Sequence, residues 1–138
     1  MDVVIFEGNM PNSPVEEMLL VARHAALRDN LEKLARVPEI ERIILVTNRE
    51  EFKSFAAMPK LTVEVNSIPP AEFHFGAELK KIIACYRIRT VLCMGGAAVP
   101  LITVDELRTL AQQVMAQTGR FVTNNVQSAD IIAFNPAD

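Results

Sequence analysis

Small and polar residues gather directly after the short apolar runs of this sequence, where parallel strands would end. They are Gly8-Asn9, Thr47-Asn48, Asn66-Ser67, Gly95-Gly96 and Asn124-Asn125. Glycine allows a ligand to approach the backbone, and an asparagine amide both donates and accepts hydrogen bonds, as recognition of a base or a sugar requires. The same residue types also form ordinary turns. Five such ends on one predicted sheet edge favour a ligand cleft over five unrelated turns.

The basic residues and histidines provide few further candidates for phosphate binding or catalysis at this edge. The sequence contains no G-x-x-x-x-G-K-[ST] or G-x-G-x-x-G phosphate loop and no G-x-S-x-G nucleophile motif. Arg23, His24 and Arg28 form either a cationic cluster for an anion or a solvated helix face. His74 stands near the start of a helix, where a packed or capping role is more typical than catalysis.

Short β-branched runs alternate with amphipathic helical stretches along the whole chain. The runs cover residues 3–6, 42–46, 61–65, 90–94, 121–123 and 131–134. Between them lie two apolar helical stripes, Phe75-Leu79-Ile82-Ile83-Tyr86 and Leu107-Leu110-Ala111-Val114. The alternation predicts one α/β domain over residues 1–138. Its architecture is a three-layer α/β/α, Rossmann-like arrangement around a mainly parallel sheet of about six strands.

Three segments carry the chemistry of a helix N-terminus. Each places an oxygen-bearing cap before an acidic first turn: Ser13-Pro14-Val15-Glu16, Asn48-Arg49-Glu50-Glu51 and Thr103-Val104-Asp105-Glu106. Gly119 is a plausible C-terminal stop for the helix that follows Thr103. These signals set the expected borders of the helices.

The first helix has an irregular apolar pattern. Val15, Met18, Leu19, Ala22 and Ala26 share one face, whereas Leu27, Leu31 and Leu34 fall on a face rotated by about a third of a turn. Either the helix kinks near Ala26, with Asp29 capping a second segment, or Asp29 projects toward a packed face as a functional acid. The sequence leaves both alternatives open.

Composition excludes several classes of protein. Half of the 138 residues are hydrophobic and 22% are charged, which excludes intrinsic disorder. The net charge of −3 and the pI of about 5.4 argue against nucleic-acid and anionic membrane partners. The chain has neither a signal peptide nor an apolar run long enough to span a membrane, so we expect a cytoplasmic protein. Cys85 and Cys93 lie in apolar runs, and we expect both to be buried free thiols.

The segment from Val91 to Leu107, VLCMGGAAVPLITVDEL, resembles a strand, loop and helix of the nucleotidyltransferase superfamily with a GT-A-type fold. This superfamily includes molybdenum-cofactor guanylyltransferase-like proteins, in which an apolar strand leads into a Gly-Asp step, Pro-Leu, a hydroxyl cap and a helix. Val3 to Gly8 is similar to the family's first strand and nucleotide-binding loop, and Glu41 to Asn48 to its second strand. The resemblance implies binding of a nucleoside triphosphate or nucleotide-sugar at the carboxyl edge of the sheet, and nucleotidyl transfer to a phosphate or hydroxyl acceptor.

The resemblance also suggests which residues form the site. We assign Gly8, Asn9, Gly95 and Gly96 to close approach of the nucleotide, and Arg23 or Arg28 to its phosphates. The expected partner is a nucleotide or another small phosphorylated metabolite. Family members continue well past this length, so the resemblance implies a truncated or naturally short chain. The last strand would then lack a neighbour, and we expect an exposed edge or a homodimer.

Two departures from the family affect the residues that the resemblance implies for catalysis. The segment Asn9 to Pro14 stands where the family has a glycine-rich signature with arginine and lysine. Gly96-Ala97-Ala98 stands where the family has a metal-binding acid, which would hold Mg²⁺. Asp130 and Asp29 remain as candidate metal contacts, although the sequence favours a strand-start turn for Asp130 and a helix kink for Asp29. The alternative function is a non-catalytic small-molecule-binding or regulatory module on the same scaffold.

Overall fold

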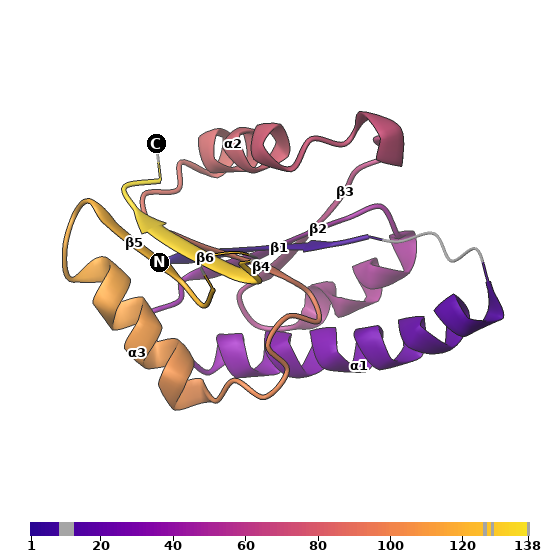
Figure 1. Ribbon diagram of the computed structural model, residues 1–138, viewed down its shortest axis with the longest axis horizontal. Helices are drawn as coiled ribbons and strands as arrows, with labels where there is room; N and C mark the ends of the chain where they lie inside the picture. The colour runs from indigo at the N-terminus through magenta and orange to yellow at the C-terminus, as the bar shows by residue number, and fades with distance from the viewer. Residues whose placement is uncertain (9–12, 126, 128, 138) are drawn as a thin grey trace.

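The chain folds into one six-stranded sheet with helices on both faces. The computed structural model describes residues 1–8, 13–125, 127 and 129–137 (Figure 1). The elements are β1 (Asp2–Glu7), α1 (Pro14–Ala35), β2 (Arg42–Thr47), the 3-10 helix η1 (Glu50–Ala57), β3 (Leu61–Val65), the 3-10 helix η2 (Pro70–Glu72), α2 (Phe75–Tyr86), β4 (Val91–Gly95), α3 (Val104–Met115), β5 (Arg120–Thr123) and β6 (Ile131–Asn135). The predicted α/β class and the six predicted strand runs are confirmed.

The strand order is β3-β2-β1-β4-β6-β5. The pairs β3–β2, β2–β1 and β1–β4 are parallel, whereas β6 is antiparallel to both β4 and β5. Five strands therefore point in one direction and only β6 points in the other. The expectation that the last strand lacks a neighbour is wrong, because β6 lies between β4 and β5 and leaves β3 and β5 as the edges.

The sheet is the middle of three layers. In Figure 1, α1 and α3 lie below the sheet and α2 lies above it. Alternate residues of β1 serve the two sides: Val3 and Ile5 pack with the α1 and α3 residues, and Val4 packs with the α2 residues. The three-layer architecture is therefore built on a central strand that is buried on both faces.

Two of the three predicted helix starts are confirmed. The Ser13 side chain accepts from the backbone N–H of Glu16, and Thr103 and Glu106 form a reciprocal capping box. The prediction at Asn48 is wrong, because η1 begins at Glu50 and the Thr47 hydroxyl accepts from the backbone N–H of Arg49 instead. Gly119 does not end α3, which stops at Met115. This glycine has a φ of 80° in the turn that leads into β5.

The first helix is continuous from Pro14 to Ala35 and does not break at Asp29. Its buried residues are Leu20, Leu27, Asn30, Leu31 and Leu34. The predicted stripe of Val15, Met18 and Leu19 is exposed, because the N-terminal end of α1 runs past the ends of the strands (Figure 1). Asp29 is exposed as well, so it neither caps a second segment nor faces the core.

The two cysteines differ in burial. Cys93 in β4 is buried as expected, whereas Cys85 in α2 is exposed, which corrects the prediction for that thiol. Burial raises the pKa of the Cys93 thiol to about 12. Among the described residues, none of the helices is both long and apolar enough to cross a membrane.

Candidate functional site

The carboxyl ends of five strands meet at one edge of the sheet. Glu7, Thr47, Val65, Gly95 and Thr123 are the last residues of β1 to β5, and the pairing directions bring all five to the same side. The loops predicted to converge therefore share this edge. They do not build one pocket together, since the described lining of the cavity comes from the β1, β2 and β3 side.

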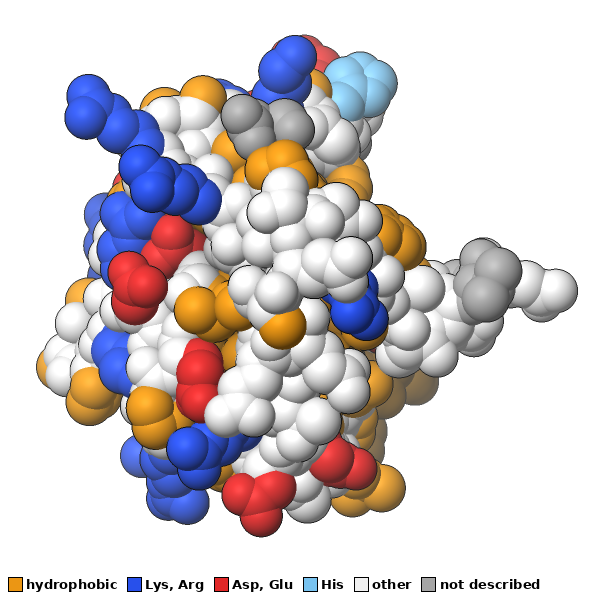
Figure 2. Space-filling model, turned by 90° about the vertical axis from the view of Figure 1, so that its left-hand side faces the viewer, with side chains coloured by type: hydrophobic (Ala, Val, Ile, Leu, Met, Phe, Trp, Pro, Cys, Tyr) orange, Lys and Arg blue, Asp and Glu red, His pale blue; other side chains and the backbone are white. Residues whose placement is uncertain are grey.

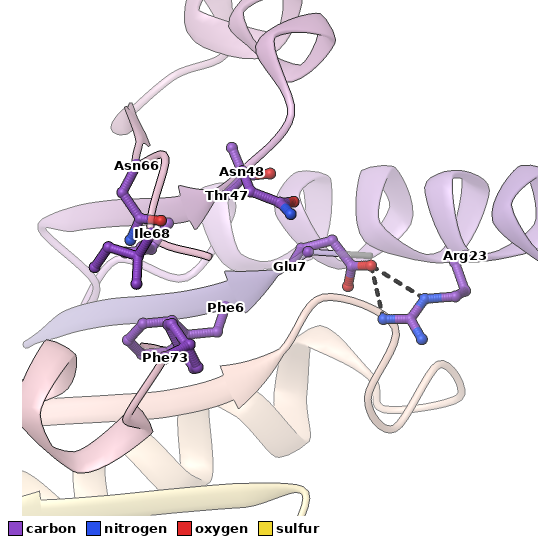
Figure 3. A pocket seen from close by; sticks show the side chains of 10 residues that line it. Phe6, Glu7, Arg23, Thr47, Asn48, Asn66, Ile68 and Phe73 are labelled. Carbon is purple, nitrogen blue, oxygen red and sulfur yellow. Dashed lines mark hydrogen bonds and ion pairs between the residues drawn. The ribbon is translucent and has the colours of Figure 1, made fainter. Parts of the chain in front are cut away.

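This cavity has a volume of about 310 Å³, and we call it the β1–β3 cavity. It is lined by Phe6, Glu7, Gly8, Arg23, Val46, Thr47, Asn48, Asn66, Ile68 and Phe73 (Figure 3). Small-molecule sites typically span about 300–1,000 Å³ and combine apolar walls with a few polar groups. The cavity meets both criteria, at the small end of the range.

Aromatic side chains form one wall of the cavity. The ring of Phe6 meets Phe73 edge to face at 5.9 Å between centroids, and Phe75 at 5.1 Å. Phe73 is 36% exposed, so part of this aromatic wall is open to solvent. An open aromatic ring offers a surface for a planar ligand such as a nucleobase.

Amide side chains follow β2 and β3 on the other side of the cavity. The Asn48 Oδ1 atom is buried and has no hydrogen-bond partner among the described residues. Gly8 permits this position, because a Cβ atom there would lie 2.9 Å from Asn48 Oδ1. The backbone N–H of Asn66 donates to the Thr47 carbonyl at 2.8 Å, which ties the two loops together. The cavity thus presents amide groups that a ligand could engage.

Glu7 is the main site residue that the sequence analysis missed. Both Nε and Nη2 of Arg23 donate to Glu7 Oε1, at 3.0 and 2.7 Å (Figure 3). The Glu7 side chain is only 2% exposed, whereas that of Arg23 is 42% exposed. Arg23 therefore lies in the predicted place, beside the cavity, but its guanidinium already compensates a buried carboxylate. The available signal was an acid that directly ends an apolar strand.

Gly95 and Gly96 lie at the same edge but do not line the described part of the cavity. Gly96 stands against Glu7, since a Cβ atom on it would lie 2.4 Å from Glu7 Oε2. Its lack of a side chain therefore makes room for that carboxylate. Gly8 lines the cavity, and Asn9 lies outside the described residues.

The loop after β4 is held by α1. Asn30 is buried, and its Nδ2 donates to the carbonyls of Gly96 and Ala98, at 3.0 and 2.9 Å. Lys33 Nζ donates to the carbonyl of Pro100 at 2.7 Å. This Asn30 clamp was not predicted, and it fixes the loop that stands beside Glu7.

Of the two alternatives for Arg23, His24 and Arg28, the cationic cluster does not form. Arg23 pairs with Glu7, and Arg28 pairs with Glu32 one helical turn away on the exposed surface. The His24 ring packs edge to face on Phe52, with its Nε2 3.5 Å from a Glu51 carboxylate oxygen. Each of the three side chains thus meets an acid of its own.

Among the described residues, neither of the two predicted metal contacts belongs to a group of side chains suited to a metal. Asp29 is exposed on α1. Asp130 accepts from Asn124 Nδ2 at 3.3 Å, while Asn124 Oδ1 accepts from the backbone N–H groups of Asp130 and Ile131. This is the geometry of a turn that starts a strand. The described residues hold no group of three or more His, Cys, Asp or Glu side chains suited to a metal.

A second hollow of about 900 Å³ lies at the opposite, amino edge of the sheet. It is bordered by α2 and the end of β6, and Lys80, Arg87 and Arg89 contribute to its lining. Figure 2 views the molecule from this side and shows basic, acidic and apolar side chains interspersed. Since parallel α/β sheets bind ligands beyond the carboxyl ends of their strands, the smaller β1–β3 cavity is the better candidate.

Three solved structures share this fold at low sequence identity. A cytidylyltransferase from Leptospira borgpetersenii serovar Hardjo-bovis matches with a TM-score of 0.62 and 16% identity, over 97% of this chain and 59% of that one. A CMP:2-keto-3-deoxy-manno-octonic acid synthetase complexed with CTP matches with a TM-score of 0.58 and 12% identity, over 96% and 73% of the two chains. A 4-diphosphocytidyl-2C-methyl-D-erythritol synthase from Anaerococcus prevotii matches with a TM-score of 0.56 and 13% identity, over 97% and 69%.

These likenesses define the fold as a nucleotidyltransferase-like α/β fold. The chain spans 59% of the length of the Leptospira cytidylyltransferase. No protein-family model matches the sequence, and no curated protein matches it significantly. The comparisons therefore show the fold of this chain alone.

Proposed function

We propose that this chain binds a nucleoside triphosphate or a nucleotide-sugar in the β1–β3 cavity and transfers the nucleotidyl group to a phosphate or hydroxyl acceptor. The observation that carries the proposal is the cavity itself. It lies at the carboxyl edge of parallel strands and combines an aromatic wall with amide groups. The nucleotidyltransferase-like fold of the solved neighbours supports it.

The size of the cavity suggests which part of the ligand it holds. A volume of about 310 Å³ suits the nucleoside end of a nucleotide better than a whole nucleotide-sugar. The base would lie against Phe73 and Phe6, within reach of the Asn66 amide. The phosphates would extend toward Arg23, the cation of the described cavity lining.

The proposed reaction is displacement at the α-phosphorus. An acceptor oxygen forms a bond to the α-phosphorus, and a hydroxyl acceptor gives up its proton to water. The bond from that phosphorus to the bridging oxygen breaks, and the leaving group is pyrophosphate from a triphosphate or a sugar phosphate from a nucleotide-sugar. Such transfers depend on positioning and on compensation of phosphate charge rather than on a protein nucleophile. A guanine base would fit the resemblance to molybdenum-cofactor guanylyltransferase-like proteins, and a cytosine base would fit the solved neighbours.

One observation favours the alternative of a non-catalytic binding or regulatory module. The Arg23 guanidinium, the proposed phosphate ligand, is already held by both of its hydrogen bonds to Glu7. A phosphorylated metabolite would have to draw Arg23 away from a buried carboxylate. We therefore keep the non-catalytic module as a second proposed function. A cytoplasmic location and a homodimer are separate proposals.

Isothermal titration calorimetry with GTP, CTP, ATP and UTP, with and without Mg²⁺, tests the binding proposal. Asn66→Ala should weaken binding of the preferred nucleotide by about 2- to 10-fold, the value of one hydrogen bond of roughly 0.5–1.5 kcal/mol. Ser67→Ala is the matched control, because Ser67 is the exposed neighbour outside the cavity lining. Absence of binding by all four nucleotides, or equal losses in both variants, would contradict the proposal.

Release of pyrophosphate separates the two functions. Phosphorus NMR of the protein with a bound nucleoside triphosphate and candidate phosphate or alcohol acceptors should show a pyrophosphate signal if transfer occurs. Nucleotide binding without pyrophosphate release for any acceptor would favour the non-catalytic module. Binding of another phosphorylated metabolite, with no binding of any of the four nucleotides, would also favour the non-catalytic module.

A further inference from the structure

The central strand β1 carries a buried carboxylate at each end, and the two are satisfied differently. At the amino end, both oxygens of Asp2 accept from Arg42, at 2.9 and 2.7 Å. At the carboxyl end, Arg23 occupies only Oε1 of Glu7. Glu7 Oε2 is buried without a hydrogen-bond partner among the described residues. An unpaired buried acceptor is costly, and one at a candidate site calls for an explanation.

The position of this oxygen supplies that explanation. Strands β1 and β4 pair Phe6 with Gly95, which places Glu7 next to Gly96. A Cβ atom on Gly96 would lie 2.4 Å from Glu7 Oε2. The carboxylate of Glu7 therefore occupies the space into which a side chain at position 96 would extend. This is the step in which the sequence resemblance expects an acid and finds glycine and alanine.

We infer that Glu7 supplies, from the neighbouring strand, the carboxylate that holds a divalent cation of the Mg²⁺ class against the phosphates of the bound nucleotide. The inference rests on the proposed function, because the cation needs the nucleotide to complete its ligands. Mg²⁺ is commonly held by one or two carboxylates together with substrate phosphates and water. One carboxylate is therefore enough, and a cluster of three acids is not required.

Two residues of the cavity lining carry oxygen atoms of the kind that a hard cation prefers. Glu7 Oε2 and Asn48 Oδ1 belong to two residues that line the same cavity, and both are buried oxygens without described partners. Arg23 balances the Glu7 charge through the other oxygen, and its side chain is exposed enough to turn toward a phosphate. We expect the cation to bind weakly to the free protein and strongly together with the nucleotide.

The metal dependence of nucleotide affinity tests this inference. Calorimetry on the full chain should show that Mg²⁺ strengthens binding of the preferred nucleotide relative to EDTA. Glu7→Gln should reduce the metal-dependent gain by at least about tenfold, since even outer-sphere changes at metal sites cost 10- to 100-fold. Asp2→Asn is the matched control and should keep the gain, because Asp2 is a buried carboxylate at the opposite end of the same strand.

A second measurement does not depend on how the variants fold. Mn²⁺ added to the wild-type protein with bound nucleotide should broaden the backbone NMR signals of Glu7, Gly8 and Gly96 first. Broadening centred on Asp130 or elsewhere would overturn the assignment of Glu7. Nucleotide binding that is equal with and without metal would overturn it too, while leaving the proposed function intact. Failure of all nucleotides to bind would overturn both.

Discussion

The variant Asn30→Ala tests how the loop beside the candidate site is held in place. Asn30 is 1% exposed on the core-facing side of α1. Its Nδ2 group donates to the carbonyls of Gly96 and Ala98, at 3.0 and 2.9 Å. Alanine removes both donors and leaves two carbonyl groups without their partner. The Gly96 bond is buried, whereas the Ala98 bond is partly buried and open to replacement by water.

The expected loss follows from these two bonds. A typical hydrogen bond contributes a net 0.5–1.5 kcal/mol or so, and a buried carbonyl left unpaired costs about 1–3 kcal/mol. Removal of Asn30 Oδ1, which is buried without a described partner, offsets part of this loss. We therefore expect the free energy of unfolding to fall by about 2–3 kcal/mol. Nearly all of this loss of stability should come from the buried hydrogen bond between Asn30 Nδ2 and the Gly96 carbonyl.

Urea denaturation followed by circular dichroism measures this loss, because the chain has no tryptophan for fluorescence. Asp29→Ala is the matched control on the exposed side of the same helix, and it should change stability by less than about 0.5 kcal/mol. A loss for Asn30→Ala that equals the control would refute the clamp. A change in the slope with urea would show instead that the variant alters the unfolded or native state more broadly.

Asn30→Asp adds a pH dependence with a definite sign. The introduced carboxyl would face two carbonyl oxygens and could donate to one of them only when protonated. Its folded pKa would therefore lie above its unfolded value of about 3.9. The stability of this variant should be highest below the unfolded pKa and should fall as the pH rises through the folded pKa. A variant as stable at pH 7 as at pH 4, relative to wild type, would contradict the geometry.

Three further predictions follow from single contacts. Gly96→Ala should lower the free energy of unfolding by about 1–3 kcal/mol through overpacking. The control Gly76→Ala should not lower it, because Gly76 in α2 has open space around it. Thermal denaturation of both variants measures the difference. Hydrogen bonds from Thr103 lower the pKa of Glu106, so stability from this group is present above its ordinary pKa of 4.5 and is lost as the pH falls; Glu106→Gln should flatten that acid limb in pH-dependent melts. In the native protein a thiol reagent should modify Cys85 alone, and reaction of Cys93 before unfolding would contradict its burial.

The alternation of apolar runs predicted the strands well because buried strands of a parallel sheet have little choice of composition. The run from Leu61 to Val65 became β3 with the predicted bounds. The antiparallel direction of β6 was not predicted, although the connection from residue 124 to 130 is too short for a parallel crossover of a dozen or more residues. The length of this connection could therefore have predicted the antiparallel direction of β6.

The first helix shows where periodicity misleads. Val15, Met18 and Leu19 of its apolar stripe are exposed, because the N-terminal end of α1 passes the end of the sheet. Its inner face includes two polar residues, Arg23 and Asn30, at helical spacing with Leu27 and Leu34. A pattern of hydrophobicity alone cannot reveal that the core-facing positions are polar, since their partners lie in distant loops.

The sequence predicted a candidate site at the sheet edge where the structure has the β1–β3 cavity, but with an incomplete set of lining residues. Turn chemistry located Gly8, Asn48 and Asn66, because glycine and asparagine mark strand ends. Glu7 was not among the predicted site residues. Its role depends on Arg23, sixteen residues away, and on Gly96 in another strand, and neither contact is visible without the fold.

The most direct test of the β1–β3 cavity as a nucleotide site is a two-dimensional NMR titration of the isotope-labelled protein with GTP and with CTP. We predict that saturable shifts will gather at the backbone amides of Glu7, Gly8, Thr47, Asn48 and Asn66, at the carboxyl edge of the sheet. Shifts confined to the amino edge, around Arg87 and Arg89, or no saturable shift with either nucleotide, would contradict the account.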